Sequence, residues 1–394
     1  MKVICDRAAL LDAVRLVAPV ASGRSPKPHY ACVHLAARKP KAGGELTLSA
    51  TDGEMAVRLT TSSVDIAIPG EGLIPADKLL QIVSAEDTEQ TLTFEFEKEV
   101  CHIRGEDAHF QLLGYPASEF PPAPDFDQVV AGTSPLGKAK TVFTQPAGSL
   151  ASMIQRTIFS TARENTRYAI NGVLFKRDGK KIEMVATDGR RLALCRGTLP
   201  GGDKAAGAIA CIVPTKVLAM LQKLLVDGDE NVTVAVTDAQ VLFALGGDAN
   251  GSGARAVLAS SLVEGSFPPY EDVIPKEFDK KVVADRDVLS SAVRRAALLT
   301  NEESRGVRLK FDAAERSVEL SSRAPEMGEA TVNAPLNSYD GDSLEIGFNP
   351  AFLTDALRVV QEPQVIMEFK GPNKPGVLRA GTEFLYVVMP VSLQ

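Results

Sequence analysis

The chain contains no tryptophan, and only 6% of its residues are aromatic. Proteins that hold single-stranded nucleic acid stack bases on aromatic side chains, so such a platform is not expected here. No apolar run reaches the roughly 18 residues that a membrane-spanning helix needs. The N-terminus, Met-Lys-Val-Ile-Cys-Asp, lacks the apolar core of a signal peptide. The sequence therefore predicts a cytoplasmic protein.

Residues that typically carry chemistry are also few. The five cysteines are odd in number and include no C-x-x-C pair, which favours buried, reduced thiols. The four histidines have neither helical spacing nor a cysteine partner, so no metal site is predicted. We find no G-x-S-x-G, no Walker loop and no dinucleotide fingerprint, and we predict no catalytic residue and no cofactor. The cysteines are Cys5, Cys32, Cys101, Cys195 and Cys211, and the histidines are His29, His34, His102 and His109.

The overall charge and composition are those of an ordinary folded protein. Hydrophobic residues make up 45% of the 394 residues and charged residues 24%, enough for two to four domains with their own cores. The net charge of −7 argues against generic tight binding to nucleic acid. It leaves room for a locally basic surface, so the distribution of charge matters more than its sum.

The most informative feature that is present is a threefold repeat. Ala50-Thr-Asp-Gly53 and Ala186-Thr-Asp-Gly189 each lie between two apolar runs, and Leu320-Ser-Ser-Arg-Ala-Pro325 stands in the same place further on. The period of roughly 130–140 residues is domain-sized and far exceeds the 20–50 residues of a solenoid repeat. The sequence therefore predicts three tandem domains of one fold.

Each repeat carries two helical segments with short strands around them. Runs such as Thr91–Glu97, Val232–Val236 and Val365–Phe369 alternate with a period of two and are expected to be strands. The fold class predicted is α+β, with two helices and antiparallel sheets in each domain. The predicted helices are Ala9–Ala18, Ala76–Ala85, Ser149–Ile158, Pro214–Leu225, Val288–Ala297 and Asn349–Val360.

The predicted domain bounds are 1–125, 142–272 and 273–394. A segment rich in proline, glycine and small residues precedes the second domain, and we assign 126–141 as a linker. Gly246–Gly253 is predicted to be a flexible loop between two strands. It lacks the Gly-Lys-Ser/Thr ending of a phosphate loop.

The Asp-Gly pairs allow two interpretations. Asp52 and Asp188 could act as nucleophiles or metal ligands, which would make the chain an enzyme. Asp-Gly between apolar runs is also a strong hairpin signal. The third repeat has Ala-Pro instead, which a turn tolerates and catalysis would not. We therefore favour the hairpin.

The helices place basic residues opposite their apolar stripes. In the first helix Leu10, Val14 and Val17 share one face, and Arg15 projects away from it. Helix surfaces commonly carry such residues in pairs with acids, so one helix alone proves little. Six helices with an outward basic residue favour a shared basic surface. Comparable positions are Lys78, Arg156, Lys216, Lys223, Arg294, Arg295 and Arg358.

Several motifs together resemble one family, the bacterial DNA polymerase III beta subunit, or sliding clamp. They cover the second and third repeats densely, and the first more loosely through Arg24 and Ala50–Gly53. The motifs are Arg167-Tyr-Ala-Ile-Asn-Gly-Val-Leu-Phe175, Val185-Ala-Thr-Asp-Gly-Arg-Arg-Leu-Ala193, Leu262-Val-Glu-Gly-Ser-Phe-Pro-Pro-Tyr270, Asn301-Glu-Glu-Ser-Arg-Gly-Val-Arg-Leu309, Glu345-Ile-Gly-Phe-Asn349 and Tyr386-Val-Val-Met-Pro-Val391.

The resemblance implies a head-to-tail homodimer that closes into a ring of six similar domains around duplex DNA. Edge strands of the first and third domains would pair between subunits. Contacts to phosphates are independent of base sequence and would permit sliding. The implied DNA-facing residues are Arg15, Arg24, Lys78, Arg156, Lys216, Lys223, Arg294, Arg295 and Arg358.

The resemblance also implies a groove between the second and third domains for a short motif of partner proteins. The partners expected are the replicative DNA polymerase alpha subunit, the clamp loader, and other DNA polymerases and repair proteins. An apolar chain end such as Val387–Val391 suits one wall of such a groove. The implied groove residues are Ile170, Thr187, Gly189, Arg190, Arg191, Leu192, Pro268, Val273, Phe352, Val387, Met389, Pro390 and Val391.

Some positions depart from the family pattern. Asp272 and Ser392 stand where many relatives place arginine, and Arg190 replaces a common histidine. The 121–140 segment and the Gly246–Gly253 loop look longer than typical, and Gln394 extends the usual end. An alternative to the clamp is a peptide-binding hub of the same fold that no longer encircles DNA.

Overall fold

The computed structural model describes residues 1–21, 27–40, 43–162, 169–200, 208–225, 230–248, 251–300, 306–325 and 327–392. By compactness the chain divides into two units, which are described separately. Unit 1 contains Met1–Ser149 and Lys216–Leu262, and unit 2 contains Leu150–Pro200, Ala208–Thr215 and Val263–Gln394. The middle repeat therefore contributes strands to both units.

Unit 1 contains two antiparallel sheets. The five-stranded sheet has the order β5(Val64–Ile68)-β1(Lys2–Asp6)-β7(Thr91–Glu97)-β8(Val100–Arg104)-β9(His109–Leu113). The eight-stranded sheet has the order β10(Thr141–Pro146)-β15(Asn231–Val236)-β16(Gln240–Leu245)-β17(Ala256–Ser261)-β4(Met55–Thr61)-β3(Glu45–Thr51)-β2(Cys32–Arg38)-β6(Gly70–Pro75). Pairing of β17 with β4 joins the second repeat to the first.

Unit 2 is built in the same way, from a nine-stranded and a four-stranded antiparallel sheet. The larger has the order β14(Ile209–Pro214)-β11(Gly172–Asp178)-β12(Lys181–Thr187)-β13(Arg191–Thr198)-β26(Phe384–Val388)-β25(Gly376–Ala380)-β24(Gln364–Phe369)-β18(Lys280–Asp285)-β22(Ser338–Asp340). The smaller has the order β21(Gly328–Pro335)-β20(Ser317–Ala324)-β19(Val307–Asp312)-β23(Leu344–Phe348). Pairing of β26 with β13 joins the third repeat to the second.

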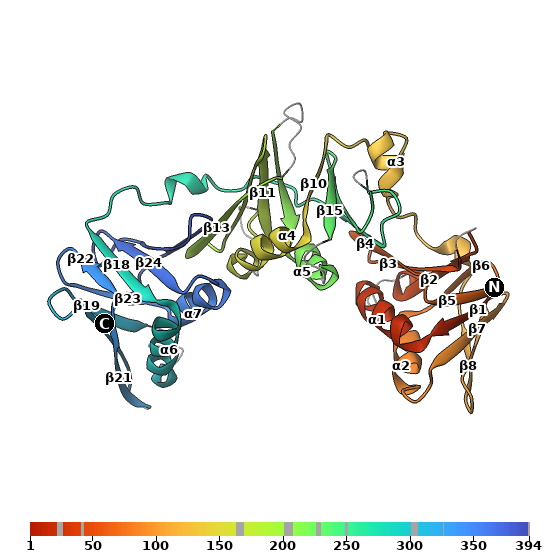
Figure 1. The fold of residues 1–394 in the computed structure, drawn as a ribbon, viewed down its shortest axis with the longest axis horizontal. Helices are drawn as coiled ribbons and strands as arrows, with labels where there is room; N and C mark the ends of the chain where they lie inside the picture. The colour runs from red at the N-terminus through yellow and green to blue at the C-terminus, as the bar shows by residue number, and fades with distance from the viewer. Residues whose placement is uncertain are drawn as a thin grey trace. The chain divides into compact units, whose positions relative to one another are not determined.

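All six predicted helices are confirmed, with small shifts at their ends. Side-chain caps explain where several begin: Asp6 accepts a hydrogen bond from the Ala9 N–H, and Asp285 and Asn349 act in the same way. In Figure 1, α1 packs beside α2 in unit 1, and α6 packs beside α7 in unit 2. The helices are α1(Arg7–Val17), α2(Ala76–Ala85), α4(Ala147–Gln155), α5(Thr215–Leu224), α6(Arg286–Ala296) and α7(Pro350–Val359).

The segment predicted as a linker contains a further short helix, α3(Phe126–Ala131). Asp125 caps its first turn by accepting from the Gln128 N–H at 3.1 Å, and also pairs with Arg58 of β4 at 3.2 Å. Phe126 and Val129 are buried against one face of β15, β16 and β17. The Gly246–Gly253 loop does connect two strands, β16 and β17, with residues 249–250 outside the described part.

The cysteines, the helix lengths and the apolar face of α1 can be compared with the expectations from the sequence. All five cysteines are buried free thiols, and burial raises the pKa of Cys5 to about 12. None of the helices in the described residues is long and apolar enough to cross a membrane. The apolar stripe of α1 (Leu10, Val14 and Val17) lies in the core as predicted.

Candidate peptide groove and DNA-facing surface

The turn between β12 and β13 forms one end of an apolar cavity in unit 2. Thr187 Oγ1 donates to the Arg191 carbonyl at 2.7 Å and accepts from the Gly189 N–H at 3.1 Å. Asp188 Oδ1 accepts from the backbone N–H groups of Arg190 and Arg191 at 2.9 and 3.0 Å. Gly189 has a φ of 85°, in the left-handed region that glycine adopts without strain.

The first repeat has the same turn. Thr51 Oγ1 donates to the Met55 carbonyl at 2.8 Å, Gly53 has a φ of 95°, and Asp52 accepts from the Met55 N–H at 2.8 Å. The hairpin prediction is therefore confirmed for both Asp-Gly pairs. In the third repeat β20 and β21 pair up to Ala324 and Gly328 without this turn.

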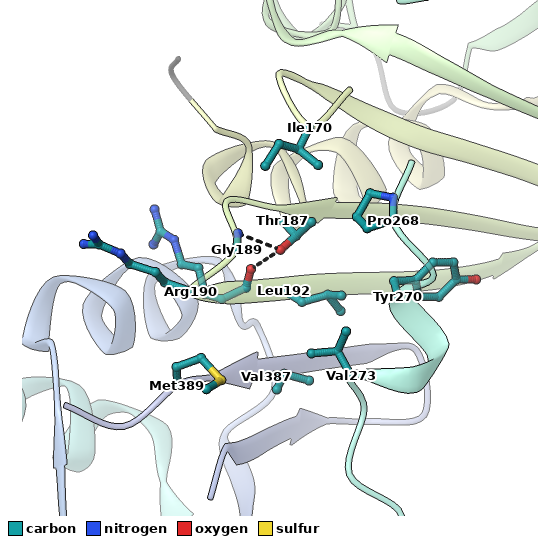
Figure 2. A pocket seen from close by; sticks show the side chains of 11 residues that line it. Ile170, Thr187, Gly189, Arg190, Leu192, Pro268, Tyr270, Val273, Val387 and Met389 are labelled. Carbon is teal, nitrogen blue, oxygen red and sulfur yellow. Dashed lines mark hydrogen bonds between the residues drawn. The ribbon is translucent and has the colours of Figure 1, made fainter. Parts of the chain in front are cut away.

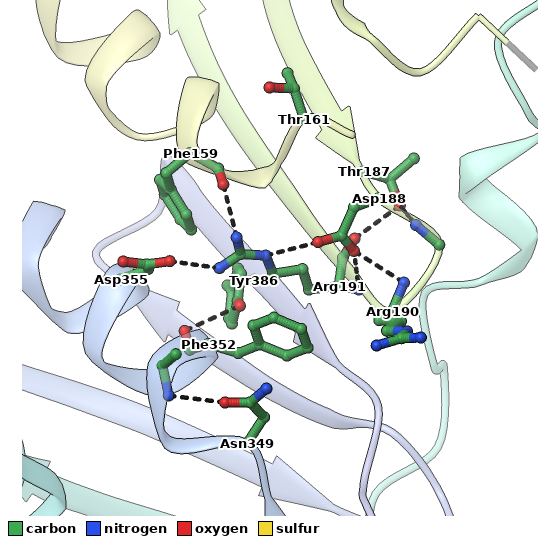
Figure 3. Close-up of polar contacts among 12 residues, drawn as sticks. Phe159, Thr161, Thr187, Asp188, Arg190, Arg191, Asn349, Phe352, Asp355 and Tyr386 are labelled. Atoms are coloured by element: carbon green, nitrogen blue, oxygen red, sulfur yellow. Dashed lines mark hydrogen bonds and ion pairs between the residues drawn. The ribbon is translucent and has the colours of Figure 1, made fainter. Parts of the chain in front are cut away.

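Arg191 anchors the second turn to the third repeat (Figure 3). Its guanidinium donates to Asp188 at 3.0 Å, to Asp355 of α7 at 2.8 Å and to the Phe159 carbonyl at 2.8 Å. It also lies over the Phe352 ring, 4.5 Å from the centroid. Burial alone would lower the pKa of Arg191, but these acidic partners raise it, so the charge is permanent. Arg191 therefore holds the turn at the end of the cavity in place.

The cavity beside this turn has a volume of about 200 Å³. Leu192 of β13 and Val387 of β26 are buried at its base, so it lies over the seam where the second and third repeats pair. Val273 is 48% exposed and Met389 40% exposed, and Figure 2 shows both beside the cavity. The lining residues are Ile170, Thr187, Gly189, Arg190, Arg191, Leu192, Pro268, Tyr270, Val273, Val387 and Met389.

Most of the predicted groove residues line this cavity, and three do not. Phe352 lies beneath the Arg191 guanidinium, and its carbonyl accepts from the Tyr386 hydroxyl at 3.0 Å. The Val391 N–H donates to the Gly347 carbonyl at 2.9 Å, which holds the chain end against unit 2. Pro390 lies between Met389 and Val391 without lining the cavity.

Tyr270 lines the cavity but was not predicted as a groove residue. Its hydroxyl donates to Glu183 at 3.0 Å and accepts from Lys176 at 3.1 Å, so its ring has a defined position. Burial raises the pKa of Tyr270, which keeps it a neutral donor. The available signal was its place at the end of the Leu262–Tyr270 motif of the family resemblance, two residues after the predicted groove residue Pro268.

Three family models match almost the whole chain. They describe the N-terminal, central and C-terminal domains of the DNA polymerase III beta subunit, at residues 1–124, 145–269 and 271–392. The chain belongs to the DNA polymerase III beta subunit family. Members of this family are sliding clamps, non-catalytic accessory subunits of DNA polymerase III, and the chain is a processivity factor rather than an enzyme.

Individual relatives agree with this assignment. The chain is 31% identical to the beta sliding clamp of Pseudomonas putida, over 98% of this chain and 99% of the relative. It is also 31% identical to that of Escherichia coli K12, over the full length of both. The structure of the Pseudomonas aeruginosa DnaN sliding clamp bound to griselimycin matches with a TM-score of 0.88 and 30% identity over both full chains. The Bacillus subtilis clamp, at 24% identity over both full chains and a TM-score of 0.87, shows the shared fold.

The two turn aspartates of this clamp-family chain serve the fold. Lys216 of α5 donates to the Asp52 carboxylate. Burial alone would raise the pKa of Asp52, but hydrogen bonds from Lys216 and from the Met55 and Glu54 N–H groups outweigh it and lower the pKa. Among the described residues, one group of carboxylates brings possible metal-ligating atoms together: Glu86, Glu89 and Asp107. It lies in unit 1, whereas the cavity described above is formed by residues of unit 2.

Most of the proposed DNA-facing residues are exposed, with one correction. The prediction that Arg156 is exposed is wrong: it is 5% exposed. α4 ends at Gln155, and Arg156 donates to both Glu362 carboxylate oxygens, at 3.0 and 3.2 Å, beneath Phe384. Arg24 lies outside the described residues. The exposed residues are Arg15, Lys78, Lys216, Lys223, Arg294, Arg295 and Arg358.

Proposed function

We propose that the chain forms a head-to-tail homodimeric ring that encircles duplex DNA and slides along it. The observation that carries the proposal is that the two junctions between repeats use the same strand pairing. Met55 and Arg191 each follow the turn aspartate by three residues, and they pair with Ser260 and Val388. At the other end of each junction, Leu59 pairs with Ala256 and Cys195 with Phe384.

The corresponding strands of the first and third repeats, β9 and β21, each have one edge that is unpaired among the described residues. In each repeat, one residue from each of four neighbouring strands can be joined into a row of successive pairs, here called a ladder. The ladder starts four residues before the first helix of the repeat. The second and third ladders end at Leu258 and Tyr386, which pair with Val57 and Ala193 of the preceding repeat. The ladders are Val3–Phe94–Ile103–Phe110, Phe143–Val234–Phe243–Leu258 and Val282–Met367–Leu378–Tyr386.

The first ladder ends at Phe110 on the edge strand β9, and β21 is an edge strand of the third repeat. Ala330 of β21 corresponds to Val57 in the first repeat and Ala193 in the second. Each of the three pairs with the residue at the same position before its turn: Ala330 with Ser322, Val57 with Ala50, and Ala193 with Ala186. Phe110 of one copy should therefore pair with Ala330 of another. Two copies joined in this way leave no free junction edge, which is the condition for closing a ring.

Exposed apolar side chains at both edges support the same contact. Leu113 of β9 is 70% exposed, and Leu298, in the short helix η6(Ala297–Leu299) that packs against β21, is 73% exposed. Leucines exposed to this degree next to open strand edges are typical of protein interfaces. Burial of both leucines in a dimer would remove them from water and stabilise the interface in addition to the backbone hydrogen bonds of the paired strands.

The proposed DNA contact uses the exposed cations of α1, α2, α5, α6 and α7. In unit 2, Arg294 and Arg295 lie in the last turn of α6, and neither has an ion-pair partner among the described residues. Unpaired guanidinium groups of this kind suit phosphate contacts that read no base sequence. A net charge of −7 then disfavours DNA binding elsewhere on the protein.

The proposed partner site is the cavity between Ile170 and Met389. Its apolar base and exposed apolar edges suit the side chains of a short peptide motif. The partners proposed are the replicative DNA polymerase alpha subunit, the clamp loader, and other DNA polymerases and repair proteins. We further propose a cytoplasmic, nucleoid-associated location and domain bounds of 1–125, 142–272 and 273–394.

Cysteine cross-linking tests the strand register on which the ring depends. Residues paired across antiparallel strands have Cα atoms about 4.5–5.5 Å apart, within disulfide range. We expect Phe110→Cys with Ala330→Cys to give a covalent dimer on oxidation, and each single variant to stay monomeric in a denaturing gel. The buried native thiols keep the background low. Equal cross-linking of Phe110→Cys with Asn333→Cys, or none with Ala330→Cys, would refute the register.

A further inference from the structure

The interior of the groove provides apolar contact but little charge. Its base and walls come from residues such as Leu192, Val387, Pro268 and Ile170. Of the two arginines that line it, Arg191 is fully engaged with Asp188, Asp355 and the Phe159 carbonyl. Any preference of the groove for charged peptide residues must therefore come from its ends.

One end of the groove carries an available positive charge. The Arg190 N–H is held by Asp188, but its side chain is exposed and has no ion-pair partner in the described part of the chain. In Figure 2 the Arg190 side chain extends away from the cavity, on the side opposite Tyr270. A peptide that lies over Leu192 and Val387 would pass this guanidinium as it leaves the groove.

The other end carries an available negative charge. The short helix η5(Tyr270–Asp272) presents two exposed acids next to the cavity-lining Val273. Glu271 is compensated by Lys176, whose ammonium lies 3.3 Å from its carboxylate. Asp272 has no ion-pair partner within the described ranges. The acid adjacent to Val273 is therefore free to attract a cation.

We propose that this groove selects partner peptides by charge polarity, taking a basic residue beside Asp272 and an acidic residue beside Arg190, on either side of the apolar anchor. The inference rests on the proposed peptide groove and adds a specificity rule to it. A peptide with the two charges exchanged would place like charges together at both ends, which destabilises the complex.

The size of the effect follows from the exposure of both groups. Exposed ion pairs contribute about 0.2–1 kcal/mol each, so two of them correspond to roughly a two- to thirtyfold difference in Kd. Salt screens such pairs, and the preference should largely disappear at about 0.5 M ionic strength. The apolar contribution of the anchor should persist at that salt concentration.

The test uses three fluorescent peptides with one Leu-Phe core, measured by fluorescence anisotropy against the full-length protein. Their flanks are Lys before and Glu after the core, Glu before and Lys after, and Gln on both sides. We expect the two charged peptides to differ in Kd by about two- to thirtyfold, with the neutral peptide between them. Arg190→Glu combined with Asp272→Arg should invert the order of the charged peptides.

A matched pair of variants separates Asp272 from its neighbour. Asp272→Asn should reduce the preference by about half, whereas Glu271→Gln should change it less, because Lys176 already compensates Glu271. Equal affinities of the two charged peptides for the wild-type protein would overturn the polarity rule. Failure of the neutral peptide to bind, with no effect of Met389→Ala on any peptide, would instead refute the groove itself.

Discussion

The two junctions between repeats have the same register but different outer faces. At the first junction Val257 and Ala259 of β17 lie beneath α3, where Phe126 and Val129 cover them. At the second, the corresponding Leu385 and Val387 of β26 lie in a cluster with Tyr270, and the cavity opens over Val387. Strand pairing thus builds the junction, and the segment that covers it decides whether it can take a ligand.

The helix α3, which covers the first junction, packs closely against the second repeat and is linked by an ion pair to the first. A Cβ on Gly251 would lie 2.4 Å from the Phe126 ring, so the glycine-rich loop and α3 fit together only without a side chain there. Asp125, which caps α3, also pairs with Arg58 across the junction. The two segments that look longer than typical in this chain are therefore both used to close its first junction.

The turns beside the two junctions have the same backbone hydrogen bonds but different side-chain partners. Asp52 and Asp188 make equivalent backbone hydrogen bonds. Asp52 then accepts from Lys216, whereas Asp188 holds Arg191, which reaches on to Asp355 in the next repeat. The same local turn therefore supports a closed junction in the first repeat and the wall of a cavity in the second.

The largest effect should come from removing the aromatic side chain that covers the first junction. Phe126→Ala leaves a cavity beneath α3 and should lower the free energy of unfolding by about 3–5 kcal/mol. Peptide binding at the second junction should be unchanged. Chemical denaturation measures the loss, with Leu136→Ala, an exposed position in the same segment, as the matched control. A loss below about 1 kcal/mol would show that α3 is not part of the folded junction.

A smaller effect should come from removing an apolar side chain at the open junction. Met389→Ala should weaken peptide binding by about 1–2 kcal/mol, roughly five- to thirtyfold in Kd, because the thioether contributes to the edge of the groove. Stability should change by less than about 0.5 kcal/mol, since Met389 is partly exposed. Met327→Ala, exposed but outside the groove, is the control. Equal affinities of the two variants would place the peptide site elsewhere.

The smallest effect should come from replacing the turn aspartate Asp52, and the resulting loss of stability should depend on pH. The pKa of Asp52 is lowered in the folded protein, so its carboxylate stabilises the fold above its unfolded pKa of about 3.9. This contribution is lost as the pH falls through the lower folded value. Asp52→Asn should therefore be less stable than wild type by about 1 kcal/mol at pH 7, with the gap closing below about pH 4.

Asp65→Asn, an exposed position on β5, provides the control for charge removal in the same repeat. It should show no gap at either pH. A gap for Asp52→Asn that stays constant down to pH 3 would mean that the hydrogen-bond geometry of the turn, and not its charge, supplies the stability.

The repeat, the helices and the hairpin turns could be predicted because local periodicity and turn chemistry determine them. α3 could not, because six residues between proline- and glycine-rich stretches are too few for a periodic pattern. Its stability comes from the cap at Asp125 and from burial of Phe126 against strands more than a hundred residues away.

The errors in the predicted site have a similar cause. The prediction for Arg156 extended the helix past Gln155, and its true partner, Glu362, is 206 residues away. The groove residues came from family resemblance and not from spacing. Phe352 was predicted to lie in the groove and Tyr270 was not, because only the fold shows which aromatic ring faces the cavity and which supports Arg191.

Retention on DNA tests the ring most directly, because a closed dimer is held by topology and not by affinity. The protein is loaded onto nicked circular duplex DNA, and gel filtration measures the bound fraction before and after the circle is linearised. We predict that the dimer stays on the circle and leaves once a free end is available. Equal retention on the circular and linear forms would contradict the account.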